Sequence, residues 1–172
     1  MLSVTLAIQG FCTVASQLPT VCQGGLFVFS GVETIKPRVC RGVFLDNPMI
    51  KGITRLAPGY SITDADLQEA LGSMSLNKVD VCLIHTGWIQ QYHDPKAFLG
   101  EDTDVPNVGE SAGKWLAAHG VHAAGAVTIA FDAIGFGPNV NQRPCRGVLL
   151  WENRIHIIEV IDLEELARDN VK

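Results

Sequence analysis

The stretch Val79-Asp80-Val81-Cys82-Leu83-Ile84-His85 is almost entirely apolar after Asp80. A continuous apolar run of this length is typical of a strand covered on both faces, as in the middle of a buried sheet. Thr86-Gly87-Trp88 follows directly, and the glycine favours a turn that ends the strand. We therefore expect residues 79–85 to form a central strand of an α/β sheet.

Three further stretches carry the β-branched, aromatic and apolar residues that are typical of strands. They cover residues 39–46, 121–129 and 155–161. The acidic, turn-rich residues 99–109 are expected to form a loop, and so are residues 135–142, which are rich in glycine, proline and asparagine.

Helix signals lie between these strands. Thr63, with Asp66 three residues later, has the pattern of an N-terminal capping box. A second helix is expected over residues 110–119, with Gly120 as its left-handed C-terminal cap, and a short helix is expected to start at Asp162. Strands that alternate with helices predict an α/β domain with a largely buried sheet.

The composition limits the class of protein. A chain of 172 residues predicts one domain, and 47% hydrophobic against 18% charged residues excludes a disordered chain. Thirteen basic and eighteen acidic residues give a net charge of −5, with no basic cluster, which argues against a nucleic-acid partner. The low charged fraction favours a large core, or apolar surface that is covered in a homo-oligomer.

Two further features bear on location. No stretch approaches the roughly 20 apolar residues that span a bilayer, so no membrane partner is expected. The five cysteines are scattered, odd in number and without a C-x-x-C pair, which favours buried thiols in a reducing compartment. We therefore expect a cytoplasmic protein.

Several polar residues lie at the ends of expected strands, where α/β sheets often bind ligands. His85 either lines a cleft with Thr86 and Trp88 or is a solvated loop histidine. Asp132 follows the strand at 121–129 and either lines the same kind of site or forms a turn. We take these four residues as the candidate lining of a small-molecule site.

Glu159 interrupts an otherwise apolar strand pattern. Strand alternation places it on the same face as Ile157 and Ile161. A carboxylate among such neighbours is costly to bury unless a cation or hydrogen-bond donors receive it. The alternative is an edge-strand glutamate that faces water, and the pattern does not choose between the two.

Five segments match one family pattern in chain order. They are residues 41–46 (similar to R-G-V-L-L-D), 56–67 (L-x-P-G-Y-x-I-T-x-x-D-L), 83–88 (L-I-R-T-G-W), 106–121 (P-G-x-G-x-x-A-x-W-L-A-x-x-G-V) and 149–166 (L-L-x-x-x-G-I-x-I-x-E-x-x-x-L-x-E-L). Together they resemble the cyclase family of metal-dependent hydrolases, which includes kynurenine formamidase. On this basis we divide the chain into a divergent N-terminal segment, 1–31, and a cyclase-family domain, 32–172.

The resemblance implies a compact swivelling β/β/α-type domain with a mixed sheet, usually assembled as a homo-oligomer. It implies hydrolysis of an N-formyl or cyclic amide, a small-molecule substrate, as in the breakdown of tryptophan through kynurenine. In this family one or two divalent cations (Zn²⁺, Mn²⁺ or Mg²⁺) activate a water molecule and polarise the carbonyl group. Glu159 matches a glutamate of the family's metal site.

The chain departs from this pattern where the metal ligands are expected. The family's H-x-G-T-H-x-D cluster lies upstream of the strand at 41–46, but no histidine precedes Arg41, so an N-terminal truncation is expected. The family places a histidine thirteen residues before the glutamate, and Arg146 stands there. A guanidinium at that position could pair with Glu159 in place of the metal charge.

Two functions follow from the resemblance and its departures. The first is a metal-dependent amide hydrolase of the arylformamidase type. The second is a non-catalytic family member that acts as a binding or oligomer-forming subunit. The second predicts a centre without metal in which Arg146 lies near Glu159. Catalytic residues are not assigned by the sequence.

Overall fold

The computed structural model describes residues 22–23, 26–27, 37, 39–101, 103–133 and 143–171. The chain divides into two compact units, Met1–Val39 and Cys40–Lys172. In the first unit, β1 (Cys22–Gln23) pairs antiparallel with β2 (Leu26–Phe27). The expected loop at 135–142 lies outside the described residues. No helix within the described ranges is long and apolar enough to cross a membrane.

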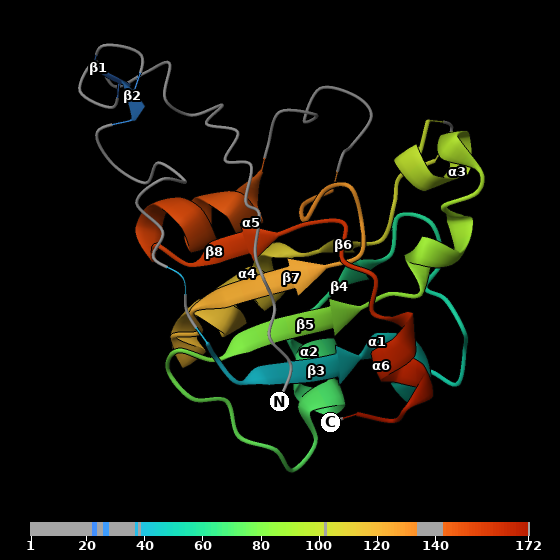
Figure 1. Cartoon of the computed structure of the whole chain (residues 1–172), viewed down its shortest axis with the longest axis horizontal. Coiled ribbons are helices and arrows are strands. Elements are labelled where there is room, and N and C mark those ends of the chain that lie inside the picture. The colour runs from blue at the N-terminus through green and yellow to red at the C-terminus, as the bar shows by residue number, and fades with distance from the viewer. Residues whose placement is uncertain are drawn as a thin grey trace. The chain divides into compact units, whose positions relative to one another are not determined.

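The second unit is built on a four-stranded sheet (Figure 1). Its strands are β3 (Gly42–Asp46), β5 (Val81–His85), β7 (Ala123–Ala126) and β8 (His156–Ile158). They lie in the order β3-β5-β7-β8, and every pairing is parallel. All five residues of β5 are buried, which confirms the expected central strand and the α/β fold class. The parallel arrangement brings the carboxyl ends of all four strands to one edge.

β7 and β8 are shorter than the sequence pattern predicted. After β7 the Thr128 hydroxyl donates to the Ala130 carbonyl (2.9 Å), which closes a turn where a strand would continue. After β8 the backbone of Val160 is left-handed (φ +58°), which a strand cannot accommodate. Glu159 therefore lies directly after the strand, and not within it as the sequence pattern predicted.

The segment at 99–109 is not only a loop. It contains β6 (Asn107–Val108), which pairs in parallel with β4 (Ser61–Ile62) in a second, two-stranded sheet. Two residues carry too little periodicity to be recognised as a strand in a sequence. Short helices missed for the same reason are α1 (Asn47–Ile50), η3 (Trp88–Gln91), α3 (Pro95–Leu99) and α5 (Pro144–Arg146), which continues into the π-helical η4 (Gly147–Glu152).

The longer helices follow their sequence signals. α2 (Asp64–Leu71) begins with the complete capping box of Thr63 and Asp66. α4 (Glu110–His119) ends at Gly120, which has the left-handed conformation expected of a C-terminal cap (φ +67°). Both helices lie behind the sheet in Figure 1, and their apolar faces share one core with it. The last helix, α6 (Glu164–Arg168), lies beside the carboxyl ends of β3 and β5.

The core lies between the sheet and these two helices. Its fully buried members include Leu45, Leu67, Ile84, Leu116 and Leu149. Two of the expected buried thiols are here: burial raises the pKa of Cys82 to about 12 and also raises the pKa of Cys145, so both stay protonated at neutral pH. The core fixes the sheet edge on which the polar residues gather.

Two buried carboxylates predict how the fold responds to acid. The Arg41 guanidinium lowers the pKa of Asp80, against the effect of burial. At Asp66, burial opposes the charged form, but hydrogen bonds from Lys51, Thr63 and Tyr60 outweigh it and lower the pKa. Because both pKa values are lower in the folded chain, the stabilisation is complete above the unfolded pKa and is lost as the pH falls through the folded one.

We expect the urea midpoint to fall as the pH is lowered from about 5 to about 3. An Asp80→Asn variant starts less stable and should show a smaller part of this decline, because an amide has no charge to lose. Asp64→Asn is the control, since Asp64 is exposed in the first turn of α2. A wild-type midpoint that does not change over this range would contradict the prediction.

Candidate functional site

Polar side chains gather at the carboxyl edge of the four-stranded sheet. Asp46 and His85 are the last residues of β3 and β5. Asp132 follows β7, and Glu159 comes directly after β8. They belong to two clusters, which we call the arginine centre (Asp132, Arg146 and Glu159) and the histidine network (Asp46, His85 and Glu164). The edge is the place where ligands bind in parallel α/β sheets.

In the arginine centre, Asp132 is buried, with 1% of its surface exposed. Its carboxylate accepts hydrogen bonds from the backbone N–H groups of Cys145 (2.7 Å) and Arg146 (3.2 Å), at the start of α5. The Arg146 guanidinium Nε lies 3.5 Å from Asp132 Oδ2. Asp132 is thus both a strand-end residue and the anchor of the next helix.

Glu159 completes the centre from the other side. Its Oε1 accepts a hydrogen bond from the Phe131 N–H (2.7 Å) and forms an ion pair with Arg146 Nη2. The side chains of Glu159 and Arg146 remain 28% and 24% exposed. The structure therefore supports the pairing of Arg146 with Glu159 and the interpretation of Glu159 as a carboxylate received by a cation and a donor.

The electrostatics of the centre depend on the guanidinium. Burial raises the pKa of Asp132, while the N–H groups of Cys145 and Arg146 and the Arg146 charge oppose that rise. Arg146 is permanently charged and lies between two carboxylates, so it supplies the compensating charge that buried anions need.

The donor set of the arginine centre does not fit a divalent cation. Its only side chains are two carboxylates and a guanidinium, and both carboxylates are already paired with Arg146 and with backbone N–H groups. A metal ion needs several unprotonated donors that face it and no cation between them. Across the described ranges, no group of three His, Cys, Asp or Glu residues is arranged to hold a metal ion.

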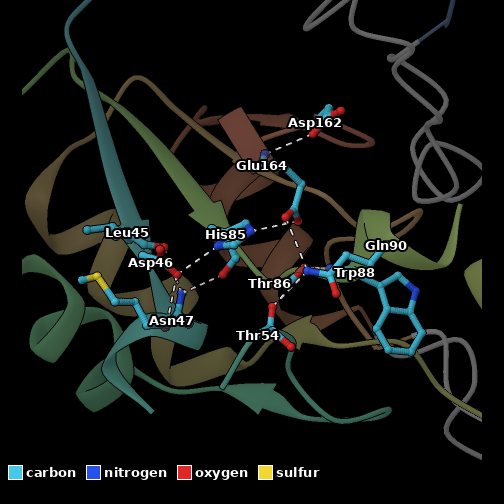
Figure 2. A network of polar contacts seen from close by, with 11 residues as sticks. Leu45, Asp46, Asn47, Thr54, His85, Thr86, Trp88, Gln90, Asp162 and Glu164 are labelled. Atoms are coloured by element: carbon cyan, nitrogen blue, oxygen red, sulfur yellow. Dashed lines mark hydrogen bonds and ion pairs between the residues drawn. The ribbon is translucent and has the colours of Figure 1, made fainter. Parts of the chain in front are cut away.

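The histidine network lies at the ends of β3 and β5 (Figure 2). His85 is buried, and both of its ring nitrogens contact carboxylates: Nδ1 lies 2.9 Å from Asp46 Oδ1, and Nε2 lies 3.1 Å from Glu164 Oε1. The Gln90 amide donates to Glu164 Oε2 (3.4 Å) and to the Thr54 carbonyl (3.2 Å). His85 thus joins the sheet to α6, the last helix of the chain.

The other two candidate lining residues are buried and have internal partners. Thr86 accepts a hydrogen bond at its hydroxyl oxygen from the Trp88 N–H (3.3 Å), within the turn. The Trp88 indole donates to the Phe98 carbonyl (3.2 Å), and the Arg55 guanidinium carbon lies over its ring, 5.7 Å from the centroid. Figure 2 places Thr86 and Trp88 beside the histidine network, on the side of Gln90. Their role as a substrate lining stays a prediction.

Asn47 is a polar residue of this edge that sequence reasoning missed. It is fully buried and donates to the carbonyls of Leu45 and His85 (both 3.3 Å), which ties the ends of β3 and β5 together. Glu164 was also missed, because it lies 79 residues from His85 in the chain. The Asp46-Asn47-Pro48 sequence, a cap followed by proline, is the local signal that could have indicated an ordered helix start.

Comparisons with known proteins place this fold. The cyclase family model matches residues 23–133. A crystal structure described as a novel cyclase is 31% identical, with a TM-score of 0.65, over 75% of this chain and 42% of that one. An isatin hydrolase bound to the product analogue thioisatinate is 17% identical (TM-score 0.58, 73% of this chain, 48% of that one).

Isatin hydrolase A from Ralstonia solanacearum is similar in the same way, at 21% identity (TM-score 0.57, 73% of this chain, 49% of that one). The chain thus spans less than half the length of these structures. A search among curated proteins gave no match. The family match covers more than half of the chain and includes the strands that carry Asp46 and His85. By its sequence and its fold, this chain belongs to the cyclase family.

Proposed function

We propose that this chain is a non-catalytic member of the cyclase family, in which an internal guanidinium stands where a hydrolytic centre would need a divalent cation. It acts as a binding or oligomer-forming subunit in the cytoplasm. The observation that carries the proposal is the position of Arg146, between the carboxylates of Asp132 and Glu159.

The chemistry of amide cleavage supports this proposal. Metal-dependent hydrolysis requires a cation with an open coordination position, which lowers the pKa of a bound water and polarises the carbonyl. A guanidinium has no open coordination position and does not ionise water. Hydrogen bonds and the Arg146 charge favour the ionised form of both carboxylates, which makes each a weaker general base. The described residues therefore form the family's fold, but the arginine centre does not supply the cation that would activate water.

A second candidate is hydrolysis of an N-formyl or cyclic amide of the kynurenine type, with Zn²⁺, Mn²⁺ or Mg²⁺ as the cofactor. The shared fold with isatin hydrolases favours it, together with Glu159 at the family's glutamate position. In this alternative Glu159 would have to leave Arg146 in order to face the metal.

Metal content and turnover, measured together, distinguish the two. The purified full chain is dialysed against Zn²⁺ or Mn²⁺, analysed for bound metal, and assayed with an N-formyl arylamine and with isatin. We expect far less than one metal ion per chain and no turnover above that of Glu159→Gln. About one equivalent of metal, with turnover that a chelator abolishes and Glu159→Gln removes, would support the hydrolase instead.

Light scattering of the purified full chain tests the oligomer-forming role. A monodisperse monomer would contradict that role.

A further inference from the structure

We propose that Asp46, His85 and Glu164 form a pH-dependent latch that holds α6 against the carboxyl end of the sheet. The proposal does not rest on the proposed function. It rests on the two contacts of one buried imidazole, 2.9 Å to Asp46 from β3 and 3.1 Å to Glu164 from α6. Figure 2 shows the three side chains in line, with His85 in the middle.

The two contacts of His85 determine how many protons the network must hold. A carboxylate only accepts, so each contact needs a proton between nitrogen and oxygen. A neutral imidazole carries one N–H and one lone pair, and it can therefore satisfy only one of two carboxylates. Both contacts are complete when the network holds two protons. When the pH rises and one proton leaves, a nitrogen lone pair faces a carboxylate oxygen across about 3 Å.

The contact with Glu164 is the one that gives way. Asp46 is fixed on the sheet, where its side chain also accepts from the Met49 N–H (3.1 Å) as the cap of α1. The Glu164 side chain is 29% exposed, against 11% for Asp46. Water can therefore readily replace the imidazole as the hydrogen-bond partner of Glu164. α6 itself buries none of its residues, which makes it a segment of low local stability.

The surroundings of His85 support this direction. The charged groups that face it are Asp46 from β3 and Glu164 from α6, and within the described ranges no cationic side chain forms an ion pair with either. The Phe44 ring lies against the imidazole (5.6 Å between centroids), and Gln90 from η3 supports Glu164 with an uncharged amide. The latch is therefore closed at low pH and released as the pH rises.

Hydrogen exchange of α6 tests the latch. In the full-length chain, amide protection over residues 162–171 is measured at about pH 5.5 and about pH 8.5, a range that spans the ordinary titration of histidine, and is corrected for the intrinsic exchange rate. We expect protection to fall about tenfold at the higher pH, which corresponds to the loss of one hydrogen bond to a charged group. Protection of β5 should not change. Equal protection of α6 at both pH values would overturn the proposal.

Two variants on one helix complete the design. Glu164→Gln should remove the pH dependence, because an amide can donate to or accept from the ring. Glu165→Gln is the matched control: Glu165 is exposed on the same helix, and this variant should keep the wild-type response. Loss of the response in both variants would indicate a general effect of charge on α6 and would contradict the latch.

Should Glu164→Gln not fold, nitrogen NMR of the His85 ring in the wild-type chain tests the proposal instead. Two protonated ring nitrogens at low pH and one at high pH are expected. A ring whose protonation does not change would overturn the proposal.

Discussion

Replacing Arg146 with methionine is expected to destabilise the fold by about 2–4 kcal/mol, slightly less than the loss of one partner from a fully buried ion pair. The change leaves the buried Asp132 and the half-buried Glu159 without their shared cation. Methionine keeps much of the apolar stem, so the loss reports mainly on charge. Partial exposure of Arg146 and Glu159 is the reason for the lower estimate, because solvent screens part of the interaction.

Urea denaturation at neutral pH measures this effect, and Lys114→Met is its matched control. Lys114 pairs with Glu110 (2.6 Å), but both side chains are more than half exposed, so this variant should change stability by no more than about 0.5 kcal/mol. Combining Arg146→Met with Glu159→Gln should recover part of the loss, because one of the two unpaired anions is removed. Equal effects of Arg146→Met and Lys114→Met would show that the centre does not depend on its guanidinium.

The parts of the fold that the sequence predicted correctly are those encoded by local patterns. The capping box of Thr63 and Asp66, the cap at Gly120 and the buried strand β5 each depend on residues within one element. Their signals are hydrogen bonds to neighbouring backbone groups or an unbroken apolar run. Such signals can be read from one segment at a time, and here they were sufficient to indicate an α/β sheet.

The candidate site was predictable only in part, because it is made by contacts between distant segments. Position 146 could be linked to Glu159 through the family pattern, but the engagement of Asp132 and the Phe131 N–H with these residues depends on how the turn after β7 meets α5. The pairing of His85 with Glu164 joins residues that lie 79 positions apart in the chain. The strand around Glu159 was predicted too long, since no sequence pattern indicated a left-handed valine directly after it.

Replacing Gly87 with alanine is expected to destabilise the fold by about 4 kcal/mol or more, in the range reserved for changes that force the backbone to move. Gly87 has φ +69°, and a Cβ at this position would lie 2.3 Å from the Thr54 carbonyl oxygen and 2.9 Å from the Arg55 Cα. These are backbone atoms, so no side-chain rotation relieves the clash. Leu56, which follows Arg55, is buried, and its N–H donates to the Thr86 carbonyl (3.0 Å). This bond holds the segment that contains Thr54 and Arg55 in place.

Gly52→Ala separates the clash from the conformational cost. Gly52 has almost the same backbone angle (φ +65°), but no atom lies within 4 Å of its added Cβ. It should therefore lose only about 1–2 kcal/mol, the cost of a left-handed alanine. Urea midpoints of the two variants, measured side by side, give the difference. Gly87 directly follows His85 and Thr86, and its close contact with Thr54 fixes the position of the turn. Gln90 lies just after this turn and donates to the Thr54 carbonyl and to Glu164. Similar losses in both variants would show that this turn is not held by close packing.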